Sequence, residues 1–218
     1  YIHSYELNYK KNIGEQVLQS SLFYRSRKDK IERLRVPYEA GVTLDSMANV
    51  GNDHALGMEL SGQFIVNKWW NLNVNGNVYY YKVVNNINAG GKEETSTNYD
   101  ITVNNLLRIC KNTRIQLDGN FVGPSVTTQG RSDSFWFVNL AIRQQWFGSN
   151  LQSTLSFRDI FNSARYKNDI TTPNLESVTH IRPKFPVITL SISYTFNHFK
   201  RSSQNSRDNR DLFEGVNH

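Results

Sequence analysis

The stretch that decides the fold is Val187-Ile188-Thr189-Leu190-Ser191-Ile192-Ser193-Tyr194-Thr195-Phe196. Its even-numbered residues are apolar, and its odd-numbered residues from Thr189 onward are small and polar. Successive side chains of a β-strand point to opposite faces, so this alternation predicts a strand with one apolar and one polar face. We expect the apolar face of this terminal strand to carry Ile188, Leu190, Ile192, Tyr194 and Phe196.

The same alternation recurs along the chain. Between Leu72 and Tyr80 the polar positions are mostly asparagine, and a face of amides is costly to bury in a dry core without partners. A water-filled lumen removes that cost. We therefore predict an all-β, antiparallel transmembrane β-barrel segment of about nine strands, near residues 1–10, 18–25, 55–66, 71–80, 99–109, 114–121, 136–146, 151–158 and 187–196.

The composition is compatible with a membrane barrel. Hydrophobic residues make up 38% of the chain and the mean hydropathy is -0.56. A transmembrane helix needs roughly 18 consecutive apolar residues, and the apolar runs here are only a few residues long, which excludes a helical membrane protein. A barrel strand shows polar side chains to the lumen, so a barrel can be hydrophilic on average.

Short and long connections alternate between these segments. The short ones lie near residues 12–14, 68–69, 111–112 and 148–149, and the long polar ones span about 28–52, 85–98, 127–134 and 159–182. Outer-membrane barrels have short periplasmic turns and longer extracellular loops. This order places interfacial aromatic residues at both rims: Trp70 and Trp146 at the periplasmic rim, and Tyr80, Tyr99 and Trp136 at the outer rim.

The final strand and several short motifs resemble the large barrels of TonB-dependent receptors, especially the outer-membrane β-barrel proteins of Bacteroidota. The motifs are Arg158-Asp159-Ile160-Phe161-Asn162-Ser163, Tyr5-Glu6-Leu7-Asn8-Tyr9, Gly57-Met58-Glu59-Leu60 and Trp69-Trp70-Asn71-Leu72-Asn73. The resemblance covers residues 1 to about 197. Each motif is short and degenerate, so their joint order carries more weight than any one.

The resemblance implies an outer-membrane location and a wall of about 22 strands around a plug. It implies four partners: membrane lipid, the upstream remainder of the barrel with its plug, a TonB-type energy-transducing protein that the upstream part engages, and a surface lipoprotein. We expect residues 1–197 to be the C-terminal portion of such a barrel in a longer chain. We expect residues 198–218 to be a polar, mobile tail, which departs from barrels that end at a terminal aromatic.

Catalytic and metal-binding patterns are weak. Five histidines are scattered without ligand-like spacing, Cys110 is the single cysteine, and Asp118 and Glu59 are expected to be solvated lumen charges. The net charge of +6 is dispersed rather than gathered on one face, which disfavours nucleic-acid binding. We predict no enzyme activity, no cofactor and no metal.

Candidate ligand contacts are the aromatic and charged groups that face the lumen or lie in loops. Tyr79, Tyr81 and Arg108 belong to inner faces, while Tyr38, Arg165 and Tyr166 lie in long connections. Ordinary loop packing is an equal explanation for each of them.

Three functions stay open on the sequence alone. The first is uptake of a large scarce nutrient such as a metal chelate, glycan or peptide. The second is a barrel of the same family that serves surface display, adhesion or secretion. The third is a soluble β-sandwich binding domain, which would pack the apolar faces into a dry core.

Overall fold

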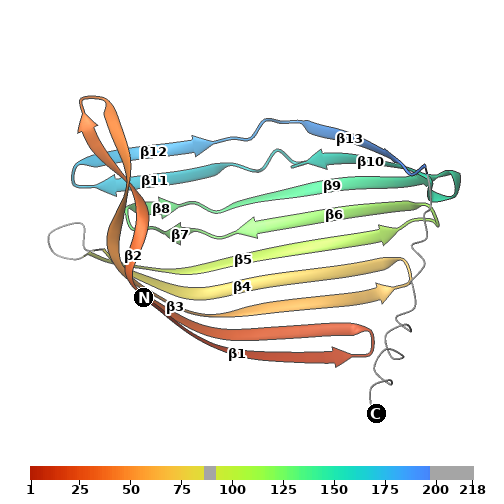
Figure 1. Cartoon of the computed structure of the whole chain (residues 1–218), viewed down its shortest axis with the longest axis horizontal. Helices are drawn as coiled ribbons and strands as arrows, with labels where there is room; N and C mark the ends of the chain where they lie inside the picture. The colour runs from red at the N-terminus through yellow and green to blue at the C-terminus, as the bar shows by residue number, and fades with distance from the viewer. Residues whose placement is uncertain (86–91, 197–218) are drawn as a thin grey trace, which may run out of the picture.

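The computed structural model describes residues 1–85 and 92–196, and almost all of them form antiparallel β-structure. Nine strands form one curved sheet in the order β1-β2-β3-β4-β5-β6-β9-β10-β13 (Figure 1). Their bounds are β1 Ile2–Ile13, β2 Gln16–Glu39, β3 Val42–Asn67, β4 Trp70–Asn85, β5 Lys92–Arg108, β6 Thr113–Val122, β9 Phe135–Trp146, β10 Leu151–Arg158 and β13 Val187–Tyr194. The predicted nine-stranded wall is confirmed. The predicted tail, residues 198–218, lies outside the described residues.

The register separates a polar face from an apolar face. Directly paired residues share a face, so Phe23, Gly57, Tyr79 and Asn98 point to one side and Leu22, Met58, Val78 and Tyr99 to the other. The first side also carries the asparagines of β4, and we call it the inner face. The second is the outer face.

No part of the chain that the structure describes covers the outer face. Leu56 is 60% exposed and Leu190 is 63% exposed, although both belong to the apolar stripe. A sandwich would bury these side chains against a second sheet. The β-sandwich alternative is therefore wrong.

Tight turns join the strands at one end of the wall, here called the turn end. They lie between β1 and β2, between β3 and β4, between β5 and β6, and between β9 and β10. The last of these four turns contains the 3₁₀ turn η1 (Phe147–Ser149). All four short connections lie where the sequence predicts them. No helix among the described residues is long and apolar enough to cross a membrane.

The four long connections contain much more strand structure than expected, which corrects the prediction of polar loops. Residues 28–52 continue β2 and β3 as a paired hairpin whose turn lies at Ala40 and Gly41. The connection at 85–98 is shortened because β4 and β5 pair as far as Asn85 and Lys92. A second, four-stranded sheet is built from β7 Ser125–Val126, β8 Gly130–Ser132, β11 Tyr166–Thr172 and β12 Leu175–Ile181.

The last strand is slightly shorter than predicted. β13 ends at Tyr194, so Phe196 lies beyond the strand and is 91% exposed, while its ring packs edge-on against Tyr194. Ladder pairing stops there because β10, the neighbour of β13, begins at Leu151 opposite Tyr194.

A β-bulge bends the β2–β3 hairpin. Pairing passes from Arg27 opposite Asp53 to Lys30 opposite Gly51, so two residues of β2 oppose one residue of β3. Asp29 has a φ of 55° and Gly51 a φ of 121°, and Asn52 Oδ1 accepts the backbone N–H of Asp29 at 3.2 Å. Beyond this bulge the hairpin turns across the ends of the neighbouring strands (Figure 1).

Candidate functional site

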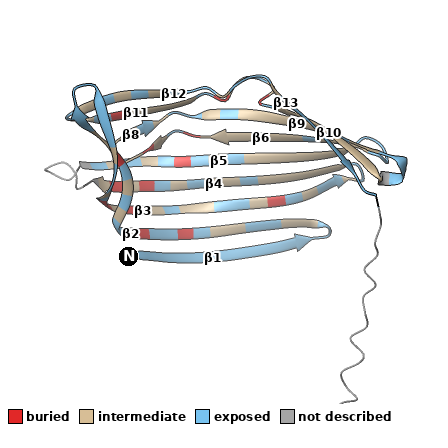
Figure 2. Ribbon diagram, turned by 45° about the horizontal axis from the view of Figure 1, so that its top comes forward, coloured by how far each residue is buried: buried red, intermediate tan, exposed pale blue. Residues whose placement is uncertain are grey.

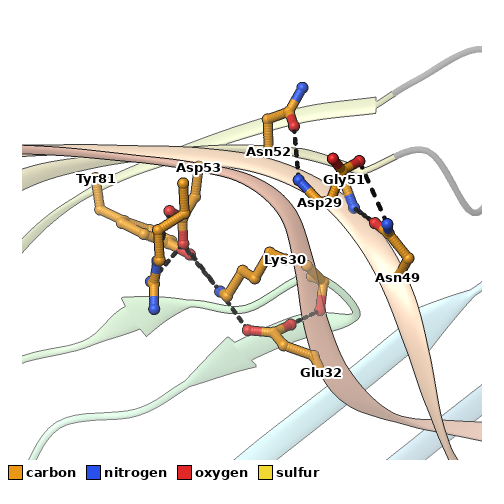
Figure 3. Close-up of polar contacts among 10 residues, drawn as sticks. Asp29, Lys30, Glu32, Asn49, Gly51, Asn52, Asp53 and Tyr81 are labelled. Atoms are coloured by element: carbon orange, nitrogen blue, oxygen red, sulfur yellow. Dashed lines mark hydrogen bonds and ion pairs between the residues drawn. The ribbon is translucent and has the colours of Figure 1, made fainter. Parts of the chain in front are cut away.

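Buried side chains gather at the end of the wall opposite the turns, on the inner face (Figure 2). Their centre is Asp53, which is 2% exposed. Its carboxylate accepts two hydrogen bonds from Arg27, at 2.8 and 2.5 Å, and one from the Tyr81 hydroxyl at 2.8 Å. The Lys30 ammonium lies 3.1 Å from the same carboxylate and donates to the Tyr81 oxygen at 2.8 Å (Figure 3). We call these four residues the Asp53 cluster.

The Asp53 cluster ties the hairpin to the barrel wall. Arg27 and Asp53 face each other across β2 and β3, Tyr81 comes from β4, and Lys30 comes from the hairpin just past the bulge. Burial raises the pKa of Asp53, but the hydrogen bonds from Arg27, Tyr81 and Lys30 outweigh it and hold that pKa below its usual range. The carboxylate is therefore ionised at neutral pH and pairs with both cations, Arg27 and Lys30.

A second set of contacts ties the hairpin to the chain around β7 and β8. Glu32 pairs with Lys30 and accepts a hydrogen bond from the Thr128 hydroxyl. Gln129 accepts the backbone N–H of Arg35 and donates to its carbonyl oxygen, both at 2.9 Å. Val126 packs with Val83 and Tyr81 beneath these contacts. The hairpin is thus held over the inner face from two sides.

A cavity of about 280 Å³ opens beside these contacts. It is lined by the ends of β4 and β5, the residues between β7 and β8, and β11, including Val83, Glu94, Thr128, Arg131, Asp169 and Thr171. One carboxylate oxygen of Asp169, Oδ1, is buried without a hydrogen-bond partner, while Oδ2 accepts from Lys167 at 2.8 Å. Threonine hydroxyls and carboxylates make this a polar cavity suited to a hydrogen-bonding ligand.

The structure brings together two of the six predicted ligand contacts. Tyr81 belongs to the Asp53 cluster, and the Tyr79 ring lies 6.4 Å from the Tyr81 ring on the same inner face. Tyr38 lies near the tip of the hairpin and is 67% exposed. Arg165 is exposed next to Tyr166, whose ring packs on Phe135 at 4.2 Å. Their contact with a ligand stays a prediction.

The sixth predicted contact, Arg108, is at the turn end. It pairs with Arg114, which pairs in turn with Arg143, so three arginines lie side by side on the inner face. Within residues 1–85 and 92–196, none of the three forms an ion pair. The sequence predicted Arg108 and Arg143 as inward-facing but could not show that they are neighbours.

The Asp53 cluster was missed by the sequence reasoning, apart from Tyr81. Lys30, Glu32 and Asp53 lie in or beside a stretch interpreted as a polar loop, where charged residues are ordinarily solvated. The available signal was Leu34 and Val36 alternating with Arg33 and Arg35, which is typical of a strand.

The predicted interfacial aromatics lie on the outer face at the two ends of the wall. Trp70 and Trp146 are at the turn end, where their indole N–H groups donate to Asn105 and Ser153, both at 3.1 Å. Tyr80, Tyr99 and Trp136 lie toward the other end. The span from Trp70 to Tyr80 matches the roughly 9–11 residues of strand that cross a bilayer. Their role as membrane anchors stays a prediction.

Other polar groups have structural explanations. The Asp159 carboxylate accepts hydrogen bonds from the backbone of Ser163 and Ala164, at 2.9 Å each, and so closes the turn after β10. Cys110 is exposed in the turn after β5, with its sulfur 3.0 Å from the Thr113 hydroxyl. Among the described residues no three His, Cys, Asp or Glu side chains are grouped to hold a metal.

Three features together define an outer-membrane barrel architecture. They are the wall with one polar and one apolar face, the alternation of short turns with long hairpins, and the aromatic residues at both ends of the wall. Comparison with known families agrees with this class, because the outer membrane protein beta-barrel family matches residues 1–194. The chain belongs to that family, and its location is the bacterial outer membrane. The hairpin end is then the extracellular end and the turn end is the periplasmic end.

Among solved structures, the chain is similar to the ferric yersiniabactin uptake receptor FyuA from Yersinia pestis. The TM-score is 0.60 and the sequence identity 18%, and the match covers 88% of this chain and 29% of the receptor. This likeness supports the fold, that of an antiparallel β-barrel wall. The chain therefore spans less than a third of the receptor it matches. No curated protein sequence matches the chain.

Proposed function

We propose that the chain is part of the wall of an outer-membrane transporter that takes up a large nutrient, such as a metal chelate, glycan or peptide. The observation that carries the proposal is the β2–β3 hairpin, held over the polar inner face by the buried Asp53 cluster. This arrangement narrows the extracellular mouth and borders a polar cavity. A passive display barrel has no need for a buried ionic contact between a hairpin and the lumen wall.

The proposal includes partners outside the described wall. The nine-stranded sheet is open, since β1 and β13 each pair on one side, and an open sheet edge is unfavourable in lipid. Further strands close the barrel, a plug fills it, and a TonB-type protein supplies energy through the plug. A surface lipoprotein is a further partner at the extracellular mouth, and the protein has no enzymatic role.

Uptake measurements in the host test the proposal. We expect deletion of the gene to abolish accumulation of one class from a panel of labelled ferric chelates, oligosaccharides and peptides. Accumulation in the parent strain should also stop when an ionophore dissipates the proton gradient, because the outer membrane itself has no energy source.

A matched pair of variants separates transport from structure. Asp53→Asn should reduce accumulation, while Asp45→Asn, in a less buried ion pair of the same hairpin, should preserve it. Unchanged accumulation of every labelled compound in the deletion strain, with altered surface adhesion, would instead establish the display barrel.

A further inference from the structure

The outer face of β1 to β4 changes character over three successive cross-strand rows near the extracellular end. The row nearest the membrane centre is apolar and consists of Leu7, Leu22, Met58 and Val78. The next row is rich in tyrosine and consists of Tyr5, Tyr24, Leu56 and Tyr80. The outermost row is polar and basic and consists of His3, Ser26, His54 and Lys82.

The apolar and tyrosine rows contain a groove of about 680 Å³. Its lining includes the outward side chains of Leu22, Leu56, Met58 and Val78. Leu22 is 52% exposed, so the protein itself does not fill the groove. This face contacts lipid in the outer membrane, and a groove of this kind is suited to one acyl chain lying along the wall.

The outermost row offers hydrogen-bond donors directly above the groove. The Tyr24 hydroxyl lies 3.2 Å from His54 Nδ1, and the two rings are stacked at 6.3 Å. When this hydroxyl donates to Nδ1, the imidazole proton is on Nε2 and is free to donate outward. Lys82, directly opposite His54, gives one of its three N–H bonds to Glu93 at 2.6 Å and keeps two.

The sequence of rows matches the sequence of groups in a membrane lipid. Tyrosine belongs at the boundary between acyl chains and headgroups, and basic side chains just beyond it meet headgroup phosphates. Lys28, exposed on the same outer face one position past Ser26, adds a further cation. The apolar row, the tyrosine row and the basic row therefore lie in the right order along β1 to β4, and the groove lies in the first two.

We propose that the outer face of β1 to β4 is a binding site for a lipid with a phosphorylated headgroup in the outer leaflet. His54 and Lys82 bind the phosphate, Tyr24 positions the imidazole of His54, and the groove beneath holds an acyl chain. The site depends on the barrel being in the outer membrane and is independent of any transported ligand.

Native mass spectrometry of the whole protein, extracted from outer membranes into neutral detergent, tests the site. The probe is dioleoyl phosphatidic acid, with dioleoylglycerol as the matched lipid that lacks the phosphate. We expect the phosphatidic acid to bind and the dioleoylglycerol to bind at least tenfold more weakly. The H54Q/K82Q double variant should lower the phosphatidic acid affinity about fivefold or more, because each basic group near a lipid headgroup contributes about that factor.

Two further variants protect the test against a folding defect. Glu93→Gln should increase the affinity, because it removes the negative charge that pairs with Lys82 and would repel a phosphate, and a misfolded barrel would not bind more tightly. R114Q/R143Q removes two cations from the inner face at the periplasmic end and should leave the affinity unchanged. Full affinity in H54Q/K82Q, equal binding of dioleoylglycerol, or displacement of the lipid by inorganic phosphate at equal concentration would each overturn the proposal.

Discussion

Asp53 is a fully buried carboxylate on a wall whose other inward polar groups are largely wet. Three different strand segments supply its donors, so the ion pairs contribute to the position of the hairpin as well as to its stability. Burying charges is costly unless each is paired, and removing one partner leaves the others unpaired. The cluster therefore acts as a unit.

Removing the Asp53 charge should release the hairpin. In Asp53→Asn, Arg27 loses the carboxylate to which it donates, and the largely buried Lys30 keeps only Glu32 as an ion-pair partner. We therefore expect the closed position of the hairpin to lose about 1–3 kcal/mol. Hydrogen exchange of the hairpin amides measures this local opening. Asp45→Asn removes a carboxylate from the exposed part of the same hairpin and is the matched control. Equal protection in the two variants would show that the Asp53 cluster does not hold the hairpin.

The hairpin should also open in acid. The folded pKa of Asp53 is lowered, so the carboxylate contributes stability that is fully present above its ordinary pKa, near 4, and is lost as the pH falls through the lower folded value. Protection of the hairpin amides is therefore expected to be flat from pH 7 to about 5 and to fall in more acidic solution. The Asp53→Asn variant should show a weaker dependence on pH, and what remains comes from Asp45, whose pKa is also lowered by its hydrogen bond with Arg35. A wild-type profile that is unchanged down to pH 2 would count against the linkage.

At the scale of the strand, alternation predicted all nine wall strands and all four tight turns. Each wall strand has water on one side and lipid on the other, so its sequence carries a period of two. The distal parts of β2 and β3 have no lipid face. Arg33 and Asp45 pair there on an exposed side, while Leu34 is buried on the other, so charge obscures the pattern. The pairing of β8 with β11 was equally hidden, because it depends on contacts between distant segments.

Gly51 should control the bend of the hairpin. Its φ of 121° lies in a region that residues with a Cβ rarely adopt, and the residue stands opposite Lys30, where the bulge redirects β2. We expect Gly51→Ala to cost roughly 1–3 kcal/mol of local stability and to raise hydrogen exchange in the hairpin. Gly41→Ala is the comparison variant, because Gly41 also has a positive φ and lies in open space at the tip of the hairpin. The two variants together show whether backbone strain at the bend or at the tip has the greater effect on the hairpin. A greater effect at the tip would argue against control by the bulge.

At the scale of the whole molecule, one curved sheet separates water on its inner face from lipid on its outer face. Among the described residues, the apolar stripe is not buried against other parts of the chain, and the exposed Ile188, Leu190 and Ile192 of β13 are stable only where lipid covers them. The hairpin, the second sheet and the cavity all lie at the extracellular end (Figure 1). In the proposed transporter, selectivity can therefore change through these extracellular segments without altering the wall, which explains why the sequence predicts the barrel well and gives little information about a ligand.

Adjacent residues of one strand provide the sharpest test of this two-sided wall. Leu155 pairs with Ile142 and Leu190 on the outer face, whereas Ser156 pairs with Ala141 and Thr189 on the inner face. In the complete barrel, Leu155→Arg should destabilise folding into lipid vesicles by about 2–4 kcal/mol, because the charge lies near the middle of the bilayer. Ser156→Arg, one residue away, should cost much less, because its side chain reaches the lumen. Denaturant titration of both variants in the same vesicles measures the difference. A larger loss for Ser156→Arg would mean that the inner and outer faces have been assigned in reverse, and equal losses would mean that the two faces do not differ as lipid and water.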